Sequence, residues 1–318
     1  MQKEYGGFIE LEHYHGDMLH KDGIKLNSAQ NCLRYLIRKW HIKTIWLPYF
    51  LCDSVPGGCH KENIEVKYYH IDENLRPVFP ENAAQEDWMY IVNYYGQLHD
   101  QELLAYKEKF DNLILDNVQA YYHKPEADIP AIYSCRKFFG VADGGIITGV
   151  RDSDGGYEKD YSYGRMEFLM GRFEKGANPF YGQYVENNEL VGELDIMEMS
   201  SLTENLLRSL DYDRIRKVRE ENFIFLHDVL GEVNALNIHC PKAPFMYPLY
   251  VGNGPAVRKQ LIANRIYVPR LWPLEYHSDS IPVEQRLSDN ILPIPCDQRY
   301  GKDDMKYITE VILNSLSV

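Results

Sequence analysis

Short apolar runs alternate with amphipathic stretches over the first 150 residues, and this alternation constrains the fold most strongly. Continuously apolar runs predict buried strands, whereas apolar residues at i, i+3, i+4 and i+7 predict a helix with one buried face. The expected strands are 44–48, 64–71, 88–92, 113–116, 132–133 and 146–148, and the expected helices are 29–40 and 100–110. Strands that alternate with helices favour the α/β class, with a mostly parallel sheet covered by helices on both faces.

The second half of the chain predicts a different organisation. Residues 151–192 are rich in Gly, Asp, Asn and Tyr, which predicts a long loop or a short irregular helix. Helical character returns near residue 195, and apolar residues between 215 and 229 mark a long helix that we expect to connect two domains. The last hundred residues predict a smaller α+β unit, with a strand at 245–251, a helix from Gly254, an extended segment at 291–295 and a final helix around 305–312.

The length of 318 residues is typical of two domains. We expect a large α/β domain over residues 1–212 and a small α+β domain over residues 213–318.

Charge and composition exclude several classes of partner. The chain has 34 basic and 47 acidic residues, a net charge of −13, so neither nucleic acid nor an acidic membrane surface is an expected partner. No apolar run approaches the roughly 20 residues that span a bilayer, and residues 1–5 lack the apolar core of a signal peptide. The six cysteines form no C-x-x-C pair and no zinc-ligand spacing. We expect free thiols, no metal and a cytoplasmic protein.

Two segments are candidate ligand contacts. Ser28-Ala29-Gln30 opens the first expected helix, where free backbone N–H groups attract an anion. An ordinary capped helix explains the same residues. Asp116 ends a buried strand, at the edge where open α/β sheets bind ligands, although such an acid also caps turns.

A third segment carries a candidate nucleophile. Lys137 follows a strand and precedes Phe138-Phe139, so its amine would be partly desolvated and therefore nucleophilic, an effect that Arg136 would reinforce. The alternative is an ordinary surface lysine. An anion-binding helix start, an acid at a strand end and a nucleophilic lysine are together what pyridoxal 5'-phosphate (PLP) requires.

These segments resemble those of the DegT–StrS sugar aminotransferases, PLP-dependent enzymes of fold type I. The shared motifs are the small-residue turn Ser28-Ala29-Gln30, the D-x-x-Q/H motif from Asp116 to Gln119, and Ser134 and Lys137 followed by Gly144-Gly145. Similarity extends to residues 47–50, 93–97 and 292–295, so it covers nearly the whole chain in the right order.

The resemblance implies a role for each residue. Lys137 would form the Schiff base and move the proton, and Asp116 would pair with the pyridine nitrogen. Gln119 would bind the phenolic oxygen, while Ser134 and the backbone of residues 28–30 would hold the phosphate. Cys52 stands where the family has an aromatic ring over the cofactor, so either Phe50, Tyr95 or another aromatic residue substitutes, or the cofactor face is covered differently.

The resemblance also implies an activity and an assembly. The expected enzyme moves an amino group from an amino acid, with glutamate as the first candidate, to a keto substrate such as a keto-sugar nucleotide. It would act as a homodimer with shared active sites, to which Asn178 or Tyr181 would contribute. Lys137 argues against the dehydratase branch, where histidine replaces the lysine.

Several alternatives stay open at this point. The same cofactor supports lyases, decarboxylases and racemases, and a relative without catalytic activity would only bind a ligand. Arg136 is a candidate for binding the cofactor phosphate or a substrate carboxylate, and Arg270 and Arg299 are further candidates for a carboxylate, with structural ion pairs as the alternative.

Overall fold

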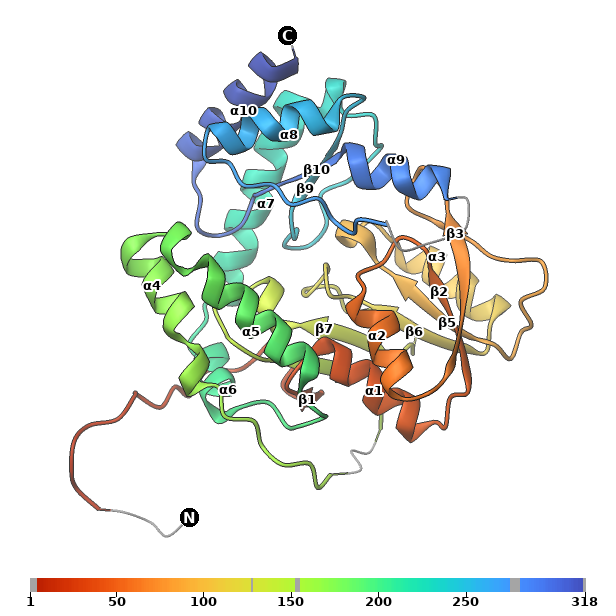
Figure 1. Ribbon diagram of the computed structural model, residues 1–318, viewed down its shortest axis with the longest axis vertical. Helices are drawn as coiled ribbons and strands as arrows, with labels where there is room; N and C mark the ends of the chain where they lie inside the picture. Colours follow the sequence, from red (N-terminus) through yellow and green to blue (C-terminus); the bar gives the residue numbers. More distant parts are fainter. Residues whose placement is uncertain (1–4, 127, 152–154, 275–280, 317–318) are drawn as a thin grey trace.

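The computed structural model describes residues 5–126, 128–151, 155–274 and 281–316. Residues 1–4, used above for the signal-peptide argument, and residues 152–154 of the expected loop lie outside this part of the chain. An eight-stranded sheet runs through the larger part of the molecule in the order β1-β8-β7-β6-β5-β2-β3-β4 (Figure 1). Its strands are β1 (Ile24–Leu26), β2 (Thr44–Pro48), β3 (Glu65–Ile71), β4 (Pro77–Val78), β5 (Trp88–Val92), β6 (Asn112–Asp116), β7 (Ala131–Ser134) and β8 (Gly145–Thr148).

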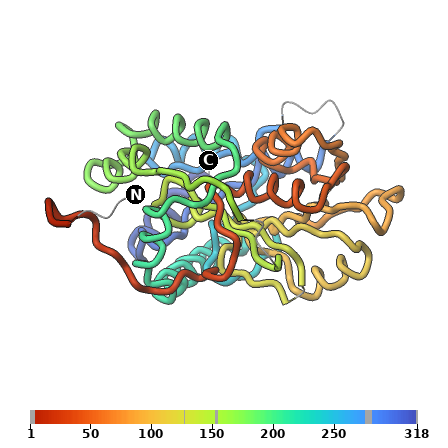
Figure 2. Tube along the Cα trace, turned by 90° about the horizontal axis from the view of Figure 1, so that it is seen from below, coloured from red at the N-terminus to blue at the C-terminus, as the bar shows by residue number. Residues whose placement is uncertain are grey.

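The central strands of this sheet are parallel, as the sequence predicts. β3, β2, β5, β6 and β7 pair in parallel, while β4, β8 and β1 are antiparallel to their neighbours. Parallel strands are joined by right-handed crossover connections, which usually contain a helix. Two crossovers that run in opposite directions along the sheet therefore place their helices on opposite faces. Accordingly α1 (Ala29–Lys39) and α2 (Ser54–Lys61) cover one face and α3 (Asp100–Lys109) the other (Figure 2).

The C-terminal part forms the expected smaller α+β unit. Helix α7 (Tyr212–Leu230) leads into a two-stranded antiparallel sheet of β9 (Tyr247–Tyr250) and β10 (Ile291–Ile294), with α8 (Gly254–Ala263), α9 (Pro282–Asn290) and α10 (Lys302–Leu316) around it (Figure 1). This arrangement confirms the α/β fold class with a second, smaller unit. The boundary between residues 212 and 213 stays a prediction, although α7 begins at Tyr212.

The expectation of a loop or short irregular helix over residues 151–192 is confirmed for residues 155–166 and wrong for residues 167–192. The segment contains two regular helices, α4 (Glu167–Lys175) and α5 (Tyr181–Glu193), joined by the 3-10 turn η4 (Asn178–Phe180). Gly171 lies directly against the Phe180 ring, since a Cβ at this position would be only 2.3 Å from ring atoms. This close contact lets the two helices form a hairpin. Helix α6 (Ser201–Arg208) follows, and it begins later than the expected position near 195.

Within the described residues, none of the helices combines the length and the apolar character needed to cross a bilayer.

Candidate functional site

Asp116 lies at the carboxyl end of β6, in the middle of the sheet. Its carboxylate is buried and accepts two hydrogen bonds, from the Tyr90 hydroxyl at 2.9 Å and from the backbone N–H of Val118 at 2.8 Å. Burial raises the pKa of Asp116 to about 6, against the lowering effect of these two hydrogen bonds and of the Lys137 charge. No lysine or arginine in the described part of the chain lies within ion-pair distance of Asp116.

Tyr90 is a contact of this site that the sequence analysis missed. In the β5–β6 pair Tyr90 is opposite Ile114, and Asp116 is two residues further along β6. Since side chains two apart along a strand share a face, Tyr90 and Asp116 lie on the same side of the sheet. A tyrosine within an otherwise apolar buried strand was the signal that could have revealed this donor.

Lys137 ends the 3-10 turn η2 (Cys135–Lys137), which directly follows β7. Its Nζ lies 5.9 Å from the centre of the Phe245 ring, and its charge lowers the pKa of Asp116, so the amine and the carboxylate share one site. The lysine side chain is exposed in the single chain. The expectation that Phe138 and Phe139 would desolvate the amine is therefore wrong: both rings turn into the core.

Gln119 lies close to the same strand ends. Its Oε1 accepts a 2.8 Å hydrogen bond from the backbone N–H of Tyr95, which has a left-handed φ of 52°. This bond holds together the turns that follow β5 and β6. The Tyr95 ring itself is fully buried.

Ser28 is the N-cap of α1, and its hydroxyl accepts a 3.1 Å hydrogen bond from the N–H of Asn31. Gly145 in β8 lies beneath this helix start, because a Cβ there would be 2.4 Å from the Ser28 carbonyl and 2.6 Å from the Ala29 nitrogen. Ala29 and Gln30 are half-buried, and the Gln30 side chain packs against α2. Ser134 is buried at the end of β7, one turn before Lys137.

Cys52 is half-buried just before α2, and its sulfur accepts a hydrogen bond from the Ser54 hydroxyl at 3.3 Å. Of the aromatic residues considered as substitutes, Phe50 packs edge-on against Trp272 at 4.8 Å between ring centres and belongs to the core. With Tyr95 also buried in the core, neither ring is placed as an obvious cover for a cofactor.

Of the other candidate residues, several have partners within the chain. Arg270 pairs with Asp289 at 2.9 Å and Arg299 with Asp297 at 2.7 Å, the structural alternative considered above. In η4 the Asn178 Oδ1 accepts a hydrogen bond from Tyr267, whereas Tyr181 is 66% exposed and is free to reach another chain.

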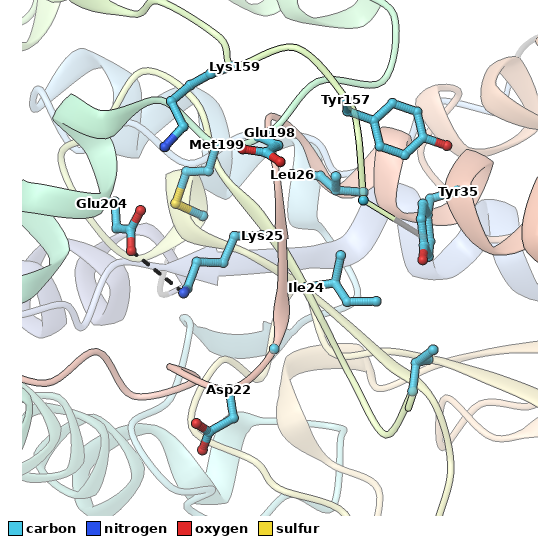
Figure 3. Close-up of a pocket in the computed structure, with 13 residues that line it drawn as sticks. Asp22, Ile24, Lys25, Leu26, Tyr35, Tyr157, Lys159, Glu198, Met199 and Glu204 are labelled. Carbon is cyan, nitrogen blue, oxygen red and sulfur yellow. Dashed lines mark ion pairs between the residues drawn. The ribbon is translucent and has the colours of Figure 1, made fainter. Parts of the chain in front are cut away.

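A separate cavity of about 340 Å³ lies at the β1 edge of the sheet (Figure 3). An ion pair of 3.6 Å joins Lys25 to Glu204 across it, and Lys159 and Glu198 line the same space. None of the residues expected to bind a cofactor lines this cavity. Across the described ranges, no group of three or more His, Cys, Asp or Glu side chains could hold a metal ion.

Comparison with known proteins gives a fold and no closer relationship. No protein-family model matches the sequence, and no curated protein is detectably similar. The sugar aminotransferase CalS13 from Micromonospora echinospora is similar in structure, with a TM-score of 0.66 at 15% identity over 92% of this chain and 87% of that chain. A DegT DnrJ EryC1 StrS aminotransferase from Brucella abortus gives a TM-score of 0.64 at 15% identity, over 92% and 85%. The chain has the fold of the DegT/StrS aminotransferases.

The same fold also occurs in a different enzyme. The E. coli GDP-4-keto-6-deoxy-D-mannose-3-dehydratase, solved with bound hydrated PLP, matches with a TM-score of 0.61 at 13% identity over 91% of this chain and 87% of that chain. The DegT/StrS fold therefore hosts more than one reaction, and the choice between reactions depends on the side chains at the strand ends.

Proposed function

We propose that this protein is a PLP-dependent aminotransferase. It would move an amino group from an amino acid, with glutamate as the first candidate, to a keto acceptor of the keto-sugar nucleotide class. The names of the structural neighbours support this proposal, since they include sugar aminotransferases and an enzyme of a keto-sugar nucleotide. Lys137 supports transfer over dehydration, because histidine replaces this lysine in the dehydratase branch.

One observation carries the cofactor proposal. The buried Asp116 carboxylate accepts hydrogen bonds only from neutral groups, and burial has raised its pKa to about 6. A buried carboxylate without a cationic partner is costly, and a protonated ring nitrogen would supply that partner. The site therefore fits PLP, with the exposed Lys137 amine in the same site.

When bound, PLP supplies an aldehyde for the substrate amine and a ring that accepts electrons from the bond being broken. Asp116 would hold the proton on the ring nitrogen, and Tyr90 and Val118 would hold the Asp116 carboxylate in place. Lys137 would hold the cofactor between turnovers and then accept and return the substrate proton at its Nζ. Ser134 and the N–H groups at Ser28, Ala29 and Gln30 would bind the phosphate, and Gln119 the phenolic oxygen.

An absorption spectrum of the purified protein tests the proposal first. We expect a band between the near-ultraviolet and the blue, and we expect borohydride reduction to fix the cofactor on Lys137, where peptide mass analysis would find it. Adding glutamate should shift the band, which a lyase or racemase need not show. Lys137→Ala should abolish turnover and covalent attachment, because no other amine would hold the cofactor there. A protein that takes up no added PLP would contradict the proposal.

We also propose a homodimer, as the resemblance implies. Large exposed apolar residues gather on the α4–α5 hairpin and the segment before it: Tyr161, Tyr163, Met170, Phe173, Tyr181, Tyr184 and Leu190. A large apolar patch is uncommon on the surface of a monomer and is typical of an interface, so exposed apolar residues concentrated in one segment support this proposal. A second copy of the chain is the proposed occupant, with Tyr181 as a candidate contributor to its site.

Two further features support the expected cellular setting. All six cysteines are free thiols, and a reducing compartment such as the cytoplasm keeps thiols in that state. The net charge of −13 supports small-molecule substrates over polyanionic partners.

A further inference from the structure

Arg136 directly precedes Lys137, yet its side chain takes a different direction. Lys137 reaches toward Phe245 and Asp116, whereas the Arg136 Nη2 donates a hydrogen bond to Asn188 Oδ1 in α5. The guanidinium is only partly exposed at this contact. Arg136 therefore lies between the turn that carries Lys137 and helix α5 of the α4–α5 hairpin.

The Arg136 guanidinium keeps most of its hydrogen-bonding capacity free. A guanidinium has five N–H donors, and Asn188 is the one acceptor that Arg136 has among the described residues. Arg219 is buried and likewise has no carboxylate partner, and it shows how the chain itself usually satisfies such a guanidinium. Its donors reach Gln298 and the backbone carbonyls of three residues, Pro244, Phe245 and Phe138. Arg219 is thus satisfied by the chain itself, and Arg136 is not.

The surroundings of Arg136 contain a second positive charge and unused polar atoms. Arg165 Nη2 donates to Asp160 Oδ2 at 2.5 Å, but its Nη1 is buried without a partner. Two side-chain oxygens of α5, Gln183 Oε1 and Asn187 Oδ1, are buried without a partner as well. Buried polar groups normally have partners, so the Arg165 Nη1 donor needs an acceptor, whereas the two amide oxygens need a donor.

No carboxylate near Arg136 fills that need. Burial lowers the pKa of Arg136, and the charge of Arg165 lowers it further, against the raising effects of Tyr184 and Asp143. Asp143 is already saturated, since its two oxygens accept from the Ser200 N–H, the Ser200 hydroxyl and the Thr203 hydroxyl. Among the described residues, Arg165 has the Asp160 carboxylate as a partner and Arg136 has none, so the two guanidinium groups together keep one uncompensated positive charge.

We propose that Arg136 and Arg165 form a subsite that binds an oxyanion group of the substrate, under α5 and next to Lys137. The proposal rests on the proposed function and adds the residues of this chain that would bind an acidic group of its substrate. Carboxylate and phosphate groups both match the forked donors of arginine. The group could come from the side-chain carboxylate of a dicarboxylic amino donor or from the diphosphate of a nucleotide-linked acceptor.

Calorimetric titration of the PLP-loaded protein tests this subsite with two unreactive probes, glutarate and inorganic pyrophosphate. We expect the wild type to bind at least one of them, and the one it binds identifies the source of the oxyanion. Arg136→Met should weaken that binding about 10- to 100-fold, as expected for the loss of charged hydrogen bonds. Arg136→Lys keeps the positive charge but lacks the forked guanidinium, so its affinity for the probe should lie between those of the wild type and Arg136→Met. Arg214→Met removes an exposed arginine on α7 and should bind as the wild type does.

Three results would overturn the proposal. In the first, the wild type binds neither probe. In the second, the Arg136 variants bind both probes as the wild type does. In the third, Arg136→Met binds the probes normally but has lost PLP, which would assign the guanidinium to the cofactor phosphate. Uptake of PLP by the wild type is measured beforehand by its absorption, so failure of the proposed function is recognised separately. If Arg136→Met does not fold, Arg136→Lys with both probes decides the question.

Discussion

At the scale of single residues, Asp116 dominates the electrostatics of the site. Its carboxylate is buried at the end of β6 with two neutral donors, and burial raises its pKa from an ordinary 3.8 to about 6. An acid with a raised pKa in the folded state stabilises the fold most at low pH, and this contribution is lost as the pH rises through the folded-state pKa. Without a cofactor, the folded protein therefore bears a cost for keeping Asp116 ionised at neutral pH.

Asp116→Asn should remove this pH dependence, because the amide does not titrate. Between about pH 4 and pH 7, the free energy of unfolding of the cofactor-free wild type should fall by about 2 kcal/mol relative to that of the variant. Urea denaturation of both proteins at several pH values measures the difference. A difference that stays constant with pH would contradict the raised pKa. Saturation with PLP should reduce the dependence, since a protonated ring nitrogen gives the carboxylate a positive partner.

The sequence motifs singled out residues at the strand ends but not their contacts. Asp116 and Ser134 end β6 and β7, and Gln119 and Lys137 follow three residues later, so a recognisable strand marks each of them. Their roles in binding a cofactor stay predictions. The exposure of Lys137 was not predictable, because it depends on where the neighbouring rings of Phe138 and Phe139 pack.

At the scale of elements, local sequence patterns predicted the strands well, but they did not predict helix α2 or the two helices of the α4–α5 hairpin. The apolar run 88–92 coincides with β5, since a buried parallel strand is marked by its own residues. Helix α2 contains Pro56, Gly57 and Gly58, which are poor helix formers. It forms where Gly58 lets the helix approach Gln30 of α1, a distant contact that no local pattern encodes.

The α4–α5 hairpin escaped prediction for a related reason. Its glycines resemble loop residues, although Gly171 is required by the Phe180 ring packed against it. Phe168 and Val191 are buried, but the larger number of its apolar side chains are exposed, so the apolar residues do not mark one buried face. When a second chain covers the apolar residues of a helix, those residues are not buried in the single chain. The sequence pattern expected for one folded chain then does not predict the helix.

The contact between α1 and β8 gives a prediction at the same scale. Gly145→Ala should push the start of α1 away from the sheet, because the new Cβ would meet the Ser28 carbonyl at 2.4 Å. Backbone atoms cannot rotate aside, so we expect a loss of about 1–3 kcal/mol in the free energy of unfolding, together with weaker PLP binding. Chemical denaturation and a PLP titration measure the two effects. Gly140→Ala is the matched control, because nothing lies within 4 Å of its Cβ position, and it should behave as the wild type does.

At the scale of the whole molecule, the exposed face of α4 and α5 lies beside the proposed substrate subsite. Arg136 reaches Asn188 on α5, while Tyr181 and Tyr184 of the same helix are exposed at 66% and 47%. A partner chain that covers this face would therefore also hold in place helix α5, which contacts Arg136. Dimerisation and substrate binding would be coupled through α5.

The dimer proposal predicts that acidic residues on this face separate the subunits. Met170 and Phe173 are 58% and 93% exposed and three residues apart on α4, so they lie on one side of the helix. Replacing both with Asp should raise the dimer dissociation constant more than about 100-fold, because carboxylates would be buried without partners. Sedimentation equilibrium measures the change, and the folded monomer should keep its circular dichroism spectrum.

A control variant separates the interface from the general effect of added charge. Ile224→Asp with Val229→Asp introduces the same two charges on α7, where the replaced side chains are 49% and 38% exposed. This variant should stay dimeric. If both double variants dissociate equally, or if the wild type is a monomer at every concentration, the α4–α5 face is not the interface. If the α4 variant alone dissociates and also binds the unreactive anions more weakly, the partner chain completes the subsite under α5 as well as burying the apolar face.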